Sequence, residues 1–95
     1  MNRQMNTKIG DWQLSFSKNV HMYCHDLIAK NGQCCIRIPC EDLPVEENII
    51  GVWLDDLDIS AKHHEELQLA LLEWANGLGI KCKVYINRDK FVTND

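Results

Sequence analysis

One segment of the chain, residues 60–79, alternates apolar and polar positions with the period of a helix. Its apolar residues are spaced by three or four positions, so they form one stripe along a helical face. Ser60 is suited to accept a backbone N–H at the start of the helix, and Gly77 or Gly79 can adopt the left-handed conformation that ends one. A helix of about 18 residues is roughly 27 Å long, enough to cross a small sheet. The stripe consists of Leu67, Ala70, Leu71, Trp74 and Leu78.

The first part of the chain shows the two-residue period of half-buried β-strands. Residues 17–19 have the composition of a turn, which would separate the first strand from the second. Asn31 and Gly32 predict a hairpin between the second strand and the third, because both residue types tolerate a positive φ. We expect these strands over residues 9–16, 20–28 and 33–39.

Two further strands are expected on either side of the helix. Residues 49–54 are apolar on both faces, which suits a central strand, and Gly51 within them indicates a bulge or a close packing contact. Residues 80–86 alternate regularly, and residues 91–92 are long enough to add a short pairing. The segment 40–48, with one proline and four acids, is typical of a surface loop.

The order of these elements, β-β-β-β-α-β, predicts an α+β fold. We expect a mostly antiparallel sheet of four to five strands with one helix packed across one face, because this arrangement buries the apolar side of both. If the last strand pairs with the fourth, the two are parallel and the crossover is right-handed. Residues 1–95 are expected to form a single domain in which residues 1–8 are frayed.

The composition and charge of the chain disfavour some classes of function. The chain has 95 residues, 45% of them hydrophobic and 25% charged, as in an ordinary globular protein. A net charge of −4 disfavours direct binding to nucleic acid, whose phosphates would be repelled. No apolar run is long enough for a membrane span, and the polar N-terminal residues do not have the apolar core of a signal peptide. We therefore expect a cytoplasmic protein that acts away from membranes.

The five cysteines favour a reduced protein without a metal centre. Their number is odd and their spacing matches no zinc or redox motif, so we expect mostly small buried thiols. Cys24 and His25 are adjacent on a strand, so their side chains face opposite ways and do not form a nucleophile–base pair. His63 and His64 diverge by about 100° on a helix. No catalytic residue, cofactor site or metal site is predicted.

The most distinctive feature of the sequence is the segregation of its acids. Residues 41–73 contain ten acidic residues and Lys62 as the only lysine or arginine, whereas the rest of the chain has four acids and nine such bases. These acids either form a solvated surface that maintains solubility or a docking surface for a basic partner. The predicted partner-binding residues are Glu41, Asp42, Glu46, Glu47, Asp55, Asp56 and Asp58.

Small size, negative charge and concentrated acids are the general profile of proteins that neutralise basic toxins or nucleases. Bacterial immunity proteins and some phage-encoded inhibitors of host defence share that profile, although no family motif is present here. We therefore expect a small acidic protein-binding module of the inhibitor or immunity type, whose partner is a basic protein. Two alternatives are a homodimeric structural or regulatory subunit without an inhibitory role and a small thiol- or metal-dependent enzyme.

Overall fold

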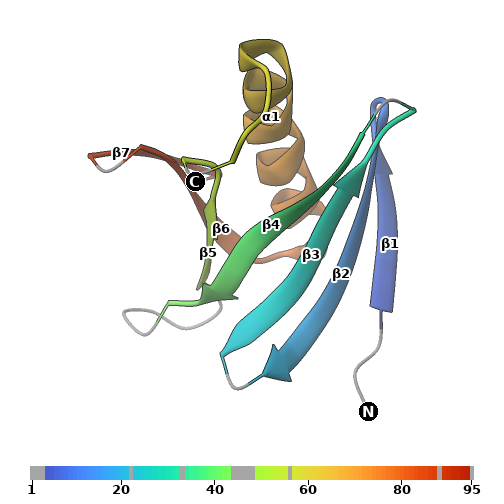
Figure 1. The fold of residues 1–95 in the computed structure, drawn as a ribbon. Helices are drawn as coiled ribbons and strands as arrows, with labels where there is room; N and C mark the ends of the chain where they lie inside the picture. Colours follow the sequence, from blue (N-terminus) through green and yellow to red (C-terminus); the bar gives the residue numbers. More distant parts are fainter. Residues whose placement is uncertain are drawn as a thin grey trace.

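The sheet of this protein is larger than the sequence predicts (Figure 1). The computed structural model describes residues 4–21, 23–32, 34–43, 49–55, 57–87 and 89–94. Within these ranges the chain forms seven strands and one helix. They are β1 (Gln4–Ile9), β2 (Trp12–His21), β3 (Cys24–Lys30), β4 (Cys35–Asp42), β5 (Ile49–Trp53), α1 (Ala61–Leu78), β6 (Lys81–Asn87) and β7 (Lys90–Thr93).

The strands are arranged in the sheet in the same order as in the sequence, β1 to β7. Every neighbouring pair is antiparallel except β5 and β6, which are parallel because α1 carries the chain back between them. The predicted α+β class, with a mostly antiparallel sheet and one helix, is confirmed. The predicted number of four to five strands is too low.

One of the additional strands is β1, which corrects the expectation that residues 1–8 are frayed. Residues 4–9 pair with β2, and residues 1–3 lie outside the described part. Gly10 and Asp11 connect the two strands, and Gly10 has a φ of 59°, which a tight hairpin turn requires and glycine adopts without strain. Met5 pairs with Phe16, so the new strand extends the inner face of the sheet.

The second correction concerns the turn expected at residues 17–19. β2 continues through that segment to His21, with an irregular register between Ser17 and His21, and the next strand begins at Cys24. The expected strand 20–28 is therefore divided between two strands, and His21 and His25 belong to different strands. Alternation restarts in β3, which places His25 on the buried face with Leu27 and Ala29.

The hairpin predicted from Asn31 and Gly32 is confirmed. β3 and β4 pair along their full lengths, with Lys30 opposite Cys35 at the turn. The Asn31 Oδ1 atom accepts a hydrogen bond of 2.9 Å from the backbone N–H of Cys34, and the Asn31 N–H donates to the Cys34 carbonyl oxygen at 3.0 Å. Asparagine closes the turn in this way because its short side chain reaches the nearby backbone.

The helix begins and ends where its capping residues predict. Ser60 is the N-cap, and its hydroxyl accepts a hydrogen bond of 3.1 Å from the backbone N–H of His63. Gly79 has a φ of 71° and ends the helix. The expected stripe faces the sheet, with Leu78 half-buried at its end. The buried helical residues are Leu67, Ala70, Leu71, Trp74 and Ala75.

The core lies in the angle between two parts of the sheet. β1–β4 form one wing and β5–β7 the other, and α1 lies between them (Figure 1). The wings are joined where residues 40–42 of β4 pair with residues 50–52 of β5. Trp74 fills the angle and contacts Phe16 edge-on, with ring centroids 5.2 Å apart.

An aromatic row crosses the outer face of the β5–β7 wing. Trp53 stacks on Tyr85 with ring centroids 5.0 Å apart, and Tyr85 contacts Phe91 on β7. The Trp53 ring also extends over Gly51, where a Cβ atom would lie 2.8 Å from Trp53 Cη2 and 3.0 Å from Leu43 Cδ2. The close packing contact predicted at Gly51 is therefore confirmed.

Trp74→Ala should destabilise the protein by about 3–5 kcal/mol, the usual cost of deleting a large core aromatic. Trp74 is 1% exposed, so the truncated site would be an enclosed cavity. Urea unfolding followed by circular dichroism measures this change. A loss below about 1 kcal/mol would contradict the placement of the helix.

Gly51→Ala and Gly77→Ala should change stability in opposite directions. The alanine methyl at position 51 would displace Trp53 from its stacked position, costing about 1–3 kcal/mol. At Gly77 in α1 no heavy atom lies within 4 Å of the added methyl, so the higher helix propensity of alanine should stabilise by about 0.5–1 kcal/mol. Thermal unfolding of both variants measures the two effects, and an equal change in both would contradict this account.

Candidate functional site

A cavity of about 820 Å³ opens at the end of the molecule where the two wings meet. Its apolar wall comes from β2, β5 and the C-terminal end of α1, with Phe16, Ile50 and Leu78 as contributors. Such a volume lies within the usual range for ligand pockets and is large enough for a long side chain of a partner. Polar side chains reach it from β3 and β4, which makes it the best-formed candidate site among the described residues.

The polar wall of the cavity is built around His25 and Asp42. His25 Nε2 lies 2.8 Å from Asp42 Oδ1, and the two side chains are 0% and 38% exposed. The imidazole donates this hydrogen bond from Nε2, and the Asp42 carboxylate oxygen accepts it. The His25 ring also contacts Phe16, with centroids 5.3 Å apart. These contacts hold the Asp42 carboxylate in the cavity wall, with one side open to a ligand.

Charged and aromatic side chains surround this pair. Glu41 lies next to Asp42 at the end of β4, and Lys18 and Tyr23 also line the cavity. Tyr23 is 68% exposed, so its ring is free to pack against a bound partner. A ligand with an apolar body and a cationic or hydrogen-bonding end would match this combination of surfaces.

The structure separates the predicted acidic residues into two groups. Glu41 and Asp42 line the cavity, whereas Asp55 and Asp58 follow the opposite end of β5. Glu41 pairs with Gly51, and four residues of extended chain from there to Asp55 span roughly 13 Å. Glu46, Glu47 and Asp56 lie outside the described residues.

A second side-chain cluster was missed by the sequence reasoning. Cys34, immediately before β4, places its Sγ atom 3.9 Å from His63 Nδ1 in the first turn of α1. The His63 ring contacts Trp12 edge-on, with centroids 5.5 Å apart. The hairpin turn predicts the position of Cys34, and the helix cap predicts that of His63. No local sequence pattern indicates that these two segments, which are far apart in the chain, lie in contact.

The described residues provide no metal site or membrane-spanning helix. No three histidine, cysteine or acidic side chains within them are close enough to hold an ion. His63 and His64 diverge as expected: His63 faces Cys34, and His64 Nδ1 lies 2.8 Å from Gln68 Nε2. In the same ranges, no helix is both long and apolar enough to cross a membrane.

His25→Ala should destabilise the protein by about 2–4 kcal/mol, because it removes a buried ring and leaves Asp42 without its partner. Tyr23→Ala, two residues away, is the matched control, and it should cost less than about 0.5 kcal/mol because Tyr23 is exposed. Urea unfolding measures the change in the free energy of unfolding for both variants. Equal losses would mean that His25 does not anchor the cavity wall.

Comparison with known proteins assigns no function to either cluster. No family model, curated protein or solved structure matches this chain. The chemistry of the cavity, of the acids and of the Cys34–His63 pair is therefore the basis of the proposals below.

Proposed function

We propose that this protein binds a basic protein partner at the cavity end of the sheet and thereby inhibits it. The observation that carries this proposal is that Glu41 and Asp42, from the acid-rich segment, lie in the wall of the 820 Å³ cavity. Negative charge and apolar surface thus occur at the same place.

The charge of Glu41 in the cavity wall is available to a partner. In the described part of the chain, the ion pairs are Asp26 with Arg37 and Asp42 with His25. Glu41, by contrast, is exposed. Unpaired surface charges of one sign attract an oppositely charged protein over several ångströms and raise its association rate. Carboxylates can also occupy the positions at which a basic nuclease binds phosphates, which would account for inhibition.

The cavity offers a pocket in which a side chain of the partner can be buried, which surface charge alone does not provide. Long-range attraction increases the rate of encounter, whereas tight binding usually depends on a few side chains that are buried in pockets. A lysine or arginine of the partner would place its apolar stem against Phe16 and Leu78 and its charged end near Asp42. This geometry favours a basic partner over a neutral one.

The homodimer alternative has a different expected behaviour in solution. A symmetric dimer formed through the cavity end would bring the acids of both copies together, which is unfavourable unless an apolar surface compensates for the repulsion. Size-exclusion chromatography with light scattering should therefore give the 11.0 kDa monomer. A stable dimer that covers the cavity would favour the alternative.

Two charge-reversal variants locate the docking surface. Glu41, Glu46 and Glu47 are changed to lysine in one variant, and Asp55, Asp56 and Asp58 in the other, so both carry the same net charge. Binding is measured by surface plasmon resonance against a panel of purified small basic nucleases at two salt concentrations. The first variant should slow association by about tenfold or more and the second should have a smaller effect, because Glu41 lies in the cavity wall and charge acts most strongly near the contact.

Lys18→Glu provides the opposite test. Lys18 lines the same cavity, so replacing its positive charge with a negative one should speed association with a basic partner. Four outcomes would contradict the proposal: no nuclease in the panel binds, binding does not depend on salt, both triple reversals have no effect, or Lys18→Glu slows association.

A further inference from the structure

The five thiols of this chain lie in different surroundings, and four of them are poorly suited to react. Cys40 and Cys82 are buried. Burial raises the pKa of the Cys82 thiol to about 12 and raises that of Cys40 well above its ordinary value, so neither readily forms a thiolate. Their surroundings also exclude most reagents.

Among the described residues, neither exposed thiol has a hydrogen bond to a histidine. Partial loss of hydration, together with the hydrogen bond and charge of Glu41, raises the pKa of the Cys24 thiol. Its Sγ atom lies 3.6 Å from Glu41 Oε2, and the negative charge of that carboxylate disfavours a thiolate beside it. Cys35 is exposed on the outer face of β4, and no side chain among the described residues hydrogen-bonds to it.

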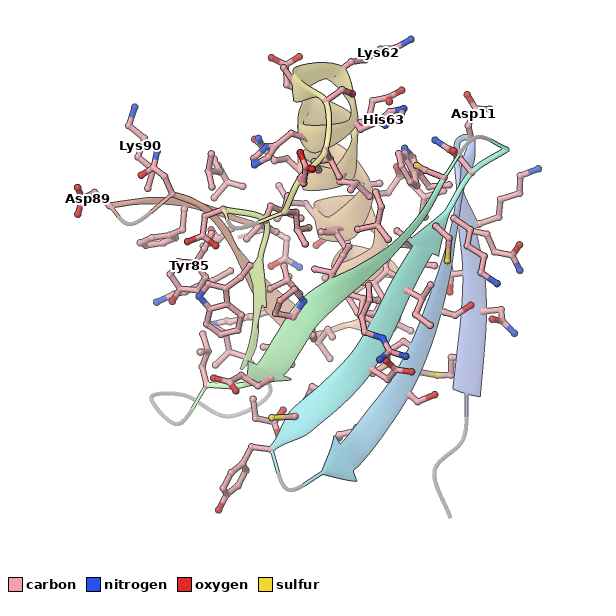
Figure 2. All side chains as sticks on the ribbon, in the orientation of Figure 1. Asp11, Lys62, His63, Tyr85, Asp89 and Lys90 are labelled. Atoms are coloured by element: carbon pink, nitrogen blue, oxygen red, sulfur yellow. The ribbon has the colours of Figure 1, made fainter. Side chains whose placement is uncertain are left out.

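Cys34 has a histidine ring nitrogen close to its sulfur. The half-buried Sγ atom lies 3.9 Å from His63 Nδ1 and 3.5 Å from Asn31 Oδ1. His63 is held in the first turn of α1 by the helix backbone and by its edge contact with Trp12. Figure 2 shows His63 near the N-terminal end of the helix, on the side toward the β1–β2 hairpin that carries Asp11.

We propose that Cys34 is a reactive thiol with His63 as its base, and that it takes a low-molecular-weight disulfide to form a mixed disulfide. The thiol proton moves to His63 Nδ1 as Sγ attacks one sulfur of the disulfide. The new Sγ–S bond forms while the disulfide S–S bond breaks, and the departing sulfur leaves as a thiol with the proton from His63. The small disulfide is the oxidant, so atoms and electrons balance.

The geometry also favours persistence of the mixed disulfide. Removing the adduct within the chain would need a second thiol that can reach the Cys34 sulfur. Cys35 is adjacent in sequence but exposed on the outer face of β4, whereas Cys34 packs against the edge of the core, so the two side chains diverge. Cys34 is thus a modification site and not half of a redox-active pair.

The test measures the modification rate of each thiol separately. The folded protein is mixed with 2-hydroxyethyl disulfide, a neutral reagent that is insensitive to the acidic surface, and samples are quenched with acid and mapped by peptide mass spectrometry. Cys34 should react at least about tenfold faster than Cys35 and Cys24, since a positioned base assists proton removal. Cys34→Ser should abolish the fast phase and leave the rate at Cys35 unchanged.

His63→Gln and His64→Gln form a matched pair of variants. Both remove one imidazole from the same helical turn, but only His63 contacts Cys34. His63→Gln should reduce the Cys34 rate to near that of Cys35, whereas His64→Gln should leave it unchanged. Circular dichroism of each variant shows that the fold is retained.

Three outcomes would overturn the proposal. The first is that Cys34 and Cys35 react at equal rates in the unsubstituted protein, a comparison that does not depend on whether any variant folds. The second is that His63→Gln leaves the modification rate of Cys34 unchanged. The third is that His64→Gln lowers that rate as much as His63→Gln does. The proposal is independent of partner binding, because the cavity residues and the Cys34–His63 pair belong to separate clusters.

Discussion

The short pairing between β4 and β5 determines the shape of the molecule. Three residue pairs, Cys40–Val52, Glu41–Gly51 and Asp42–Ile50, join the two wings of the sheet, and the Leu43 N–H donates to the Ile49 carbonyl oxygen beside them. The space between the wings would expose apolar surface on both sides, so α1 and Trp74 are required to fill it. The cavity opens at the joined end of the wings. The same junction requires a residue without a side chain, because Trp53 and Leu43 occupy the volume over Gly51.

The junction also explains why charge and apolar surface coincide at one end of the protein. β4 ends there with Glu41 and Asp42, and His25 on the neighbouring strand holds Asp42 toward the cavity. The acids that follow β5 lie at the other end of that strand and are separated from the first group by its length. A partner that docks at the cavity would therefore meet the first group, and the second would contribute mainly to the general field of the protein.

Residues whose role depends on local geometry were predictable from the sequence. Ser60 and Gly79 mark the helix, Asn31 and Gly32 mark a hairpin, and the apolar stripe identifies the buried face of α1, since each acts on its near neighbours in the chain. The β1–β2 turn carried a comparable signal in Gly10-Asp11, which the polar character of the first residues obscured.

The candidate sites were less predictable because they depend on contacts between distant segments. His25 and Asp42 meet only after β3 and β4 pair, because they come from neighbouring strands. Cys34 and His63 meet only after the helix packs against the sheet. Periodicity within a segment cannot specify such contacts, which are set by strand register and by helix position.

The match between strand order and chain order has a consequence for how this protein folds. Each of β1 to β4 pairs with the strand next to it in the sequence, so these contacts close short loops and favour rapid formation. The parallel pair β5–β6 is different, because the chain must pass through the whole of α1 before Trp53 reaches Tyr85. Closing this crossover carries the largest loop-entropy cost between neighbouring strands, so we infer that it limits the folding rate of the chain.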